Sequence, residues 1–372
     1  MVEPEANRTA AAPAELLFGV AGWSYKDWGG IVYPAGADGA TKMLAVAAAC
    51  DVLEINTSFY ATPAVGVTTA WARRLDRAGL PNRFVLKLNR VFSHEPQYSA
   101  DDVRAVREAI RPLDDSAIVD RDGVEQPRLL GLLLQFPHYF RLTPENTQRI
   151  ERLAEDFADH TRFIELRHAS WVQPVVYDWL RKFDYALVNI DLPASPRASR
   201  RKLARPTPAE PADEADSPPG EHLFPTEPIA TAPAAYLRLH GRNAQAWFDR
   251  KAPVDQKYNY LYTPAELSDL ADRIRALAQR TRSVTVVGNN HYRGKALATV
   301  LNLAHLLTGR RVKLPAAMLA EYPQLVGFAE PIEPAQPLLD ERSDAPPGPK
   351  AKPKSPRPRK RGGDDPQMTL FD

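Results

Sequence analysis

Residues 16–25 read LLFGVAGWSY, a short apolar run that ends in an aromatic and polar cluster. The pattern recurs seven times, usually with a helix-like stretch before the next run: VLEINTSFY at 52–60, FVLKLNR at 84–90, LLGLLLQFP at 129–137, RFIELRHASW at 162–171, YALVNID at 185–191, AAYLRLHGR at 234–242 and SVTVVGNNHYRG at 283–294. Such runs are typical of parallel strands joined by crossover helices. Eight units predict a closed (β/α)8 TIM-type barrel of the α/β class, whose active site lies at the carboxyl ends of the strands.

Composition sets broad limits on the protein. A chain of 372 residues holds one barrel of roughly 250 residues plus appendages, and we expect a single domain over 15–330. The formal net charge is only +2, so any affinity for nucleic acid has to come from a local patch. Cys50 is the sole cysteine, which excludes an intramolecular disulfide, and its apolar surroundings predict a core position. Neither a secretory signal nor a membrane-spanning stretch is evident, so a cytoplasmic protein is expected.

Three segments fall outside the expected barrel. Residues 1–14 carry acids and prolines, and we expect them to be disordered. Residues 193–225 have too few apolar side chains to offset the entropy of ordering them. We expect a flexible insertion there, in the loop after the sixth strand. From 331 to 372 the sequence is proline-rich and carries a basic cluster at 350–361, which predicts a disordered tether.

Helices are expected at 41–49, 64–78, 101–113, 144–158, 173–182, 264–280 and 294–308. Two have clear starts, because Thr143 and Thr263 each precede a proline at the first helical position.

Charged residues share strand faces with apolar ones, since residues two apart on a strand point to the same side. The aligned sets are Val52, Glu54 and Asn56; Val85, Lys87 and Asn89; Phe163, Glu165 and Arg167; and Tyr236, Arg238 and His240. If these faces line the lumen, charges replace the apolar layers that normally fill a barrel, and they have to pair or bind something. One interpretation is a structural ion-pair network around Glu54, Lys87 and Arg238. The other is a functional site nearer the carboxyl ends.

The functional interpretation uses the upper strand residues and the loops that follow them. The strand residues are Asn56, Asn89, Glu165, Arg167, Asn189, Asp191, His240 and Asn289, and the loop residues are Trp23, Tyr25, Tyr60, His94, His168, Trp171, Arg242, Asn290, His291 and Arg293. Several cations beside few carboxylates suit an anionic substrate, and we expect phosphate. Aromatic rings, including Tyr258, Tyr260 and Tyr262, offer faces for a base or sugar. The expected substrate contacts are Trp23, Tyr25, Asn56, Tyr60, Lys87, Arg167, Trp171, Arg238, Arg242, Asn289 and Asn290.

The candidate catalytic residues are Glu165, His168, His240 and Asp191, as acid, base or metal ligands. Together with His291 they also offer a donor set for a divalent metal, as in metal-dependent phosphodiesterases. No tight histidine motif such as HExxH supports a metal, and the neighbouring arginines favour salt bridges.

The phrases GVAGWSYKDWGGIVYPAG, LEINTSFYATP, FVLKLNRVFSHE, LLLQFP, IELRHASW, YLRLHGR, YNYLYTPAEL and GNNHYRGKALATVLNLAHLL resemble the domain of unknown function 72 family, also called YecE-like. The resemblance covers about 16–329 and implies a (β/α)8 barrel, but no activity. It implies a shared residue set of Gly22, Trp23, Ser24, Tyr25, Glu54, Asn56, Tyr60, Lys87, Glu165, Arg167, His168, Trp171, Arg238, His240, Gly241, Arg242, Asn289 and Asn290. The insertion at 193–225 and Gly288, where the family usually has an aromatic residue, depart from the pattern.

Residues 367–372 read QMTLFD and resemble the short peptide by which bacterial polymerases and repair proteins dock on the replication sliding clamp. Gln367 suits a polar pocket rim, and Met368, Leu370 and Phe371 suit an apolar groove. A random amphipathic end is the alternative, because short motifs often match by chance.

Three functions compete at this point. The first is an enzyme acting on a phosphate-bearing, nucleic-acid-related substrate and recruited to the clamp, and the second is a non-catalytic nucleic-acid-binding or adaptor protein. The third, glycoside hydrolysis, needs two carboxylates across a sugar, and the evident pair, Glu54 and Glu165, is matched to cations. The enzyme hypothesis requires an open cationic pocket above the charged residues.

Overall fold

The computed structural model describes residues 13–120, 123–193, 227–249 and 251–332, and at its centre eight parallel strands form a closed barrel. In order around the barrel they are β1 (Glu15–Ala21), β2 (Val52–Ile55), β3 (Arg83–Lys87), β6 (Leu129–Gln135), β7 (Arg162–Glu165), β8 (Tyr185–Asp191), β9 (Ala234–Leu239) and β10 (Ser283–Gly288). β10 pairs with β1 from Glu15↔Ser283 to Val20↔Gly288, which closes the sheet. The predicted (β/α)8 barrel is confirmed.

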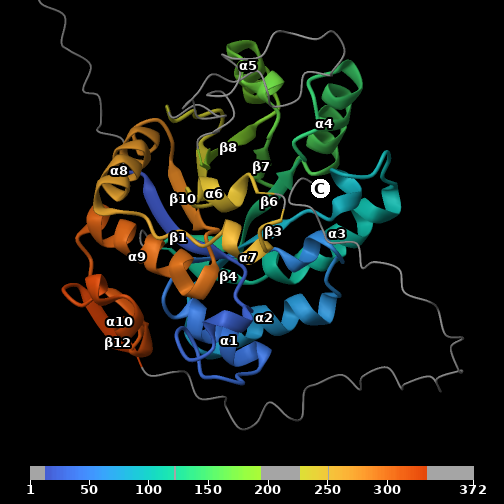
Figure 1. Ribbon diagram of the computed structural model, residues 1–372. Helices are drawn as coiled ribbons and strands as arrows, with labels where there is room; N and C mark the ends of the chain where they lie inside the picture. The colour runs from blue at the N-terminus through green and yellow to red at the C-terminus, as the bar shows by residue number, and fades with distance from the viewer. Residues whose placement is uncertain (1–12, 121–122, 194–226, 250, 333–372) are drawn as a thin grey trace, which may run out of the picture.

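Helices surround the strands (Figure 1). They are α1 (Gly39–Ala47), α2 (Val65–Arg77), α3 (Ala100–Asp114), α4 (Pro144–Asp156), α5 (Pro174–Lys182), α8 (Pro264–Ala278) and α9 (Lys295–Thr308). Each lies close to the range expected from the sequence. The two predicted starts are present, because the Thr143 hydroxyl accepts from the Asn146 amide and Thr263 forms a capping box with Glu266.

The sequence analysis missed several short elements. A hairpin of β4 (Ala117–Val119) and β5 (Glu125–Pro127) precedes β6, and a parallel pair of β11 (Val312–Pro315) and β12 (Ala329–Ile332) follows α9. Helix α10 (Ala317–Glu321) and the 3-10 turn η9 (Pro323–Leu325) lie between that pair. Two short helices, α6 (Ala244–Trp247) and α7 (Val254–Lys257), follow β9. They matter for function, because the loop after a barrel strand lies at the mouth.

Single 3-10 turns follow five of the barrel strands. They are η1 (Lys26–Trp28), η2 (Thr57–Phe59), η3 (Arg90–Phe92), η4 (Ala169–Trp171) and η8 (Tyr292–Gly294), after β1, β2, β3, β7 and β10. Each turn begins within a few residues of the end of its strand.

The lumen has an apolar layer with a charged layer above it. Val52, Val85, Leu133, Phe163 and Tyr236 belong to a buried cluster separate from the larger core between strands and helices. Two residues further along the same strands, and therefore on the same face, stand Glu54, Lys87, Gln135, Glu165 and Arg238. The predicted parity of these strands is confirmed.

Several sequence predictions lie partly or wholly outside the described residues. They concern the segments 1–12, 194–226 and 333–372, which contain most of the expected N-terminal region, insertion and tether. Within the described residues, Cys50 is a buried free cysteine of the core, as expected. No helix in that part of the chain combines the length and apolar character needed to cross a membrane.

Gly288 allows α9 to pack directly on β10. A Cβ atom at this position would lie 2.7 Å from the carbonyl oxygen of Ala296 and 3.1 Å from its Cα, both backbone atoms of α9. An aromatic residue here therefore requires a different separation of strand and helix.

We expect Gly288→Ala to lower the free energy of unfolding by about 1–3 kcal/mol, because the clash is with backbone that cannot rotate away. Denaturant unfolding measures the change. The matched control is Gly66→Ala on α2, where no heavy atom lies within 4 Å of the added Cβ. That variant should be neutral or gain up to about 1 kcal/mol, and equal losses in both variants would contradict the packing argument.

Candidate functional site at the barrel mouth

Arg238 lies at the centre of the lumen and is the hub of a buried ion-pair network. Its side chain is 1% exposed and that of Glu54 is 0% exposed. Arg238 Nη2 donates to Glu54 Oε1 at 2.7 Å and Arg238 Nε donates to Glu54 Oε2 at 3.1 Å, which makes the ion pair bidentate. The Tyr236 hydroxyl donates a further hydrogen bond to Glu54 Oε2 at 2.8 Å. Both oxygens of Glu54 are therefore occupied.

Glu165 is held between two guanidinium groups. Arg238 Nη1 donates to Glu165 Oε2 at 2.5 Å, and Arg167 Nε donates to Oε1 at 2.6 Å. Burial by itself would raise the pKa of Glu165, but the two cations outweigh burial and hold that pKa below its ordinary value. Glu165 is thus an anion at neutral pH, and it accepts hydrogen bonds from both Arg167 and Arg238.

A pocket of about 280 Å³ opens above this network at the carboxyl ends of the strands. Its walls contain four cationic residues and no carboxylate. The lining residues are Tyr25, Asn56, Phe59, Tyr60, Lys87, Arg90, His94, Gln135, Arg167, Arg238, Val254, Tyr258, Asn289 and His291. The open cationic pocket that the enzyme hypothesis requires is therefore present, above a charged network that is itself paired.

Lys87 ends β3 and points into this pocket. Its ammonium nitrogen lies 4.1 Å from the centroid of the Phe59 ring, and no ion pair joins it to a carboxylate within the described residues. Burial, together with the positive charges of Arg238 and Arg167, lowers the pKa of Lys87 to about 7. A substantial fraction of this amine is consequently uncharged at neutral pH.

His240 is completely buried next to the pocket. Asn289 Nδ2 lies 2.9 Å from His240 Nδ1. Because the amide nitrogen of Asn289 donates this hydrogen bond, Nδ1 is the acceptor and the ring proton is on Nε2. Nε2 has no hydrogen-bond partner and lies 4.0 Å from Glu165 Oε1. Burial and the charge of Arg238 lower the pKa of His240 well below its ordinary value, so its ring is neutral.

Two further polar atoms on the pocket wall are buried without a partner, Asn56 Oδ1 and His291 Nδ1. Burial lowers the pKa of His291 to about 4, and the ring is neutral at pH 7. Unsatisfied buried groups cost roughly 1–3 kcal/mol each unless water or a ligand bonds them. Their position beside the cations makes this pocket the candidate binding site.

Aromatic rings form the sides of the pocket. Tyr25 stacks on His291 with ring centroids 4.4 Å apart, and the Tyr258 ring packs at a tilt against the same His291 ring with centroids 4.8 Å apart. Phe59 packs edge-on against His94 at 4.9 Å. Because Tyr258 follows α7, the loop after β9 contributes to this wall.

Asp191 is placed differently from the sequence expectation. Val188 and Ile190 of β8 belong to the lumen cluster, so Asn189 and Asp191 face outwards. Asp191 accepts hydrogen bonds from Arg242, Arg273 and Tyr262, the second of which lies on α8. It does not line the pocket, and neither does Arg242.

Other expected site residues serve packing and turns. Trp23 packs edge-on against Trp71, and the Trp171 indole donates to the Phe140 carbonyl at 2.6 Å. Asn290 Nδ2 donates to the Tyr260 carbonyl. The His168 ring caps the η4 turn by accepting from the Ser170 amide at 3.0 Å. None of these four lines the pocket.

Sequence reasoning also missed some lining residues, namely Phe59, Arg90, Gln135 and Val254. Gln135 was accessible to the parity argument, because it lies two residues after Leu133 on β6. In the part of the chain that the structure describes, no group of three or more His, Cys, Asp or Glu side chains is placed to hold a metal ion.

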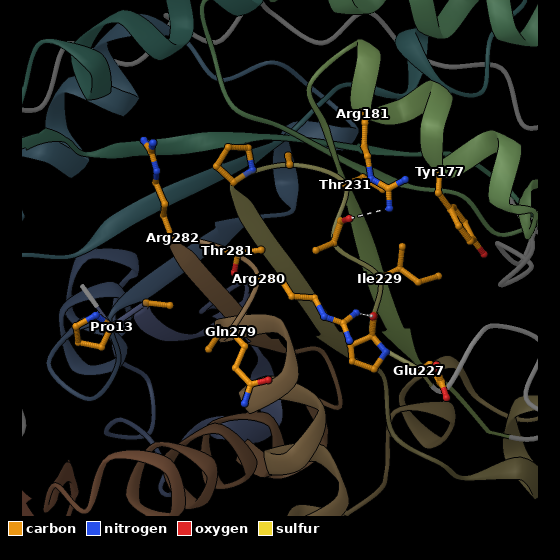
Figure 2. Close-up of a pocket in the computed structure, with 16 residues that line it drawn as sticks. Pro13, Tyr177, Arg181, Glu227, Ile229, Thr231, Gln279, Arg280, Thr281 and Arg282 are labelled. Carbon is orange, nitrogen blue, oxygen red and sulfur yellow. Dashed lines mark hydrogen bonds between the residues drawn. The ribbon is translucent and has the colours of Figure 1, made fainter. Parts of the chain in front are cut away.

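A larger groove, of about 1030 Å³, lies at the opposite end of the barrel. It is bordered by the residues before β1, β9 and β10 and by the end of α8. Figure 2 shows Arg280 and Arg181 approaching the segment 227–231, and they donate to the carbonyls of Pro228 and Ala230, each at 3.3 Å. These arginines stabilise the chain entering β9, at the end of a barrel that usually serves stability rather than catalysis.

Comparison with known proteins agrees with the fold and assigns no activity. The profile of a family described as "Protein of unknown function DUF72" matches residues 17–323. UPF0759 protein YunF of Bacillus subtilis (strain 168) is 24% identical over 303 residues, covering 78% of this chain and 94% of that protein. A DUF72 family protein from Thermotoga maritima MSB8 superimposes with a TM-score of 0.62 at 27% identity, covering 79% and 99% of the two chains. One from Enterococcus faecalis V583 does so with a TM-score of 0.61 at 23% identity, covering 78% and 95%.

We expect Arg238→Met to lose about 3–5 kcal/mol of unfolding free energy at pH 7, because two buried carboxylates lose their common partner. In the wild type the pKa of Glu165 is lowered, so ionised Glu165 stabilises the folded protein at neutral pH, and this stabilisation is lost in acid. Without Arg238 that pKa rises, so the deficit of the variant should shrink as the pH falls from 7 to 5. Denaturant unfolding at several pH values measures this.

Arg104→Met is the matched control, since Arg104 pairs with Asp101 on the surface of α3, where both side chains are more than half exposed. We expect a change of at most about 0.5 kcal/mol at every pH. A deficit in Arg238→Met that stays constant between pH 7 and pH 5 would show that lost packing, and not lost charge pairing, is the cause.

Proposed function

The chain belongs to the DUF72 family of proteins of unknown function, and from that premise we propose that it is an enzyme acting on a phosphate-bearing, nucleic-acid-related substrate at the barrel mouth. The observation that carries the proposal is the charge of the pocket wall. Lys87, Arg90, Arg167 and Arg238 line it and no carboxylate does, while the nearest acids are already paired beneath it. An anion entering the pocket therefore meets a wall that presents cationic side chains, while the acids that pair with Arg90, Arg167 and Arg238 do not line it.

The size of the pocket restricts the substrate. About 280 Å³ accommodates a phosphoryl group with one attached sugar or ring, but not a strand of nucleic acid. A polymer would enter only by a terminal or extruded nucleotide. Tyr60, which is 58% exposed at the rim, and Tyr258 inside offer rings against which a base or sugar can stack.

We assign a proposed role to each residue from its contacts. Arg167, which Glu165 holds in place, presents its remaining guanidinium nitrogens to the phosphate. His240 and His291 are neutral and have free ring nitrogens, which suits proton transfer. Glu165 acts as the orienting anion. His168 and Asp191, which are engaged elsewhere, have no part in this proposal.

A non-catalytic binding or adaptor protein is the second candidate, and the complete pairing of Glu54 and Glu165 favours it, since neither acid is free to act. The same pairing disfavours a glycosidase, which needs one carboxylic acid and one carboxylate facing the sugar. Turnover of any phosphorylated compound that depends on pocket residues separates an enzyme from an adaptor.

We also propose that residues 367–372 recruit the protein to a sliding clamp. The peptide QMTLFD supports this through its spacing of glutamine and apolar residues, and it lies outside the described residues. The basic segment at 350–361 that precedes it suits a location close to nucleic acid.

The pocket proposal predicts that inorganic phosphate binds the wild-type protein and that Arg167→Gln weakens this binding by about tenfold or more, the loss expected for one charge-assisted contact. Isothermal titration calorimetry measures the affinity. The matched control is Arg280→Gln, which removes a cation from the larger groove at the other end of the barrel. If phosphate affinity falls in the Arg280 variant and not in the Arg167 variant, the anion site has been assigned to the wrong end.

The clamp proposal predicts saturable binding of a labelled peptide spanning 362–372 to a bacterial sliding clamp in a fluorescence anisotropy titration. The doubly substituted peptide Leu370→Ala, Phe371→Ala should lose binding, because both apolar anchors are removed. A control in which Thr369 is changed to Ala should bind as the parent does. Equal affinity of the parent and doubly substituted peptides would eliminate the proposal.

A further inference from the structure

Lys87 is not explained by the ion-pair network beneath it. A structural lysine in a barrel lumen would be expected to neutralise a carboxylate. Here the oxygens of Glu54 are bonded by Arg238 and Tyr236, and those of Glu165 by Arg238 and Arg167. Among the described residues, none of these acids forms an ion pair with Lys87, so its amine faces the pocket beside the Phe59 ring.

The surroundings of this amine favour its unprotonated form. Desolvation acts first, and the guanidinium groups of Arg238 and Arg167 add repulsion, so that the pKa of Lys87 falls to about 7. A lysine that is desolvated and next to another cation is the arrangement that makes an amine nucleophilic at neutral pH. An ammonium group meant only to attract anions would gain nothing from this arrangement.

We propose that Lys87 is a nucleophile that forms an imine with the aldehyde or ketone group of a phosphate-bearing substrate. The carbonyl chemistry rests on Lys87 alone, while the phosphate rests on the proposed function. Both share one pocket, whose wall includes Arg167 and Arg90. Arg167 pairs with Glu165 and Arg90 pairs with Glu95, each through Nε, which leaves the terminal guanidinium nitrogens for an anion. The substrate class is therefore a small phosphorylated carbonyl compound, free or at the end of a nucleic-acid strand.

The proposed step balances without any other reactant. The Lys87 nitrogen bonds to the carbonyl carbon, and the carbonyl oxygen leaves as water with the two hydrogens of the neutral amine. Two groups on the pocket wall can relay protons during this exchange. Burial raises the pKa of Tyr258, which keeps its hydroxyl protonated as a donor, and His291 is neutral with Nδ1 free to accept.

The test uses pyridoxal 5′-phosphate, an aldehyde that carries a phosphate, followed by borohydride reduction and peptide mapping of the full-length protein. At pH 7 we expect Lys87 to be labelled about tenfold faster or more than Lys313, an exposed lysine on β11. Labelling of Lys87 should level off above pH 7, because the lowered pKa of Lys87 leaves most of its amine uncharged there. This comparison is made within the wild-type protein, so it does not depend on a variant that folds.

Two variants and two competitors complete the experiment. Lys87→Arg keeps the charge but cannot form an imine, and it should abolish the fast label, while Lys313→Arg should leave that label unchanged. Inorganic phosphate should slow labelling of Lys87, and pyridoxal without its phosphate should react more slowly. A phosphorylated sugar and an oligonucleotide with a terminal sugar aldehyde, each trapped by borohydride, distinguish a free substrate from a strand end.

Each outcome has a separate meaning. If Lys87 reacts no faster than Lys313 while phosphate still binds, the nucleophile is refuted and the proposed function remains. If Lys87 reacts fast but equally with pyridoxal, and phosphate does not compete, the nucleophile stands and the phosphate-bearing substrate is refuted.

Discussion

The contact of Arg238 with Glu54 and Glu165 is the constraint on which the upper half of the barrel depends. Three charges are buried where a barrel normally has branched apolar side chains. Well-packed apolar residues in their place would be at least as stable as a rule, so stability alone does not account for the network. The network does orient a pocket residue, because Glu165 Oε1 lies 2.6 Å from Arg167 Nε and the Arg167 side chain lines the pocket.

The network also determines which charged side chains line the pocket at the carboxyl ends of the strands. Of the five charged residues grouped there, Glu54 and Glu165 are acids, and Lys87, Arg167 and Arg238 are bases. Both acids lie below the pocket surface and all three bases line it. The basic side chains of this group therefore face the pocket, while the acids that pair with Arg167 and Arg238 do not line it. Burial lowers the pKa of Lys87, and the positive charges of Arg238 and Arg167 lower it further, so the two arginines that face an anion also favour the uncharged amine.

The sequence predicted this layer because strand periodicity is two, which makes face assignment reliable wherever one charged residue is known to face inwards. It failed at β8 for a physical reason. Both faces of a strand in a parallel barrel are buried, so apolar and polar residues do not distinguish inside from outside. The partner that explains Asp191 is Arg273, 82 residues away on α8, and no local pattern reveals it. Tyr258 likewise enters the pocket from a short helical loop that has no strand to fix its register.

The groove and the pocket differ in the polar and charged groups that line them, and this difference matters more than their volumes. The groove of about 1030 Å³ is the larger, yet its arginines donate to backbone carbonyls, and none of its described side chains has a buried polar atom without a partner. The pocket of about 280 Å³ has two such atoms on its wall, in Asn56 and His291, and a third beside it in His240. Each costs free energy in the folded protein, and each lies near the cationic side chains of the pocket wall. Asn56 Oδ1 accepts hydrogen bonds and suits a donor such as a ligand hydroxyl, whereas the cationic side chains suit the oxygens of a phosphate. The pocket wall is therefore complementary to a ligand that carries both a phosphate and a hydrogen-bond donor.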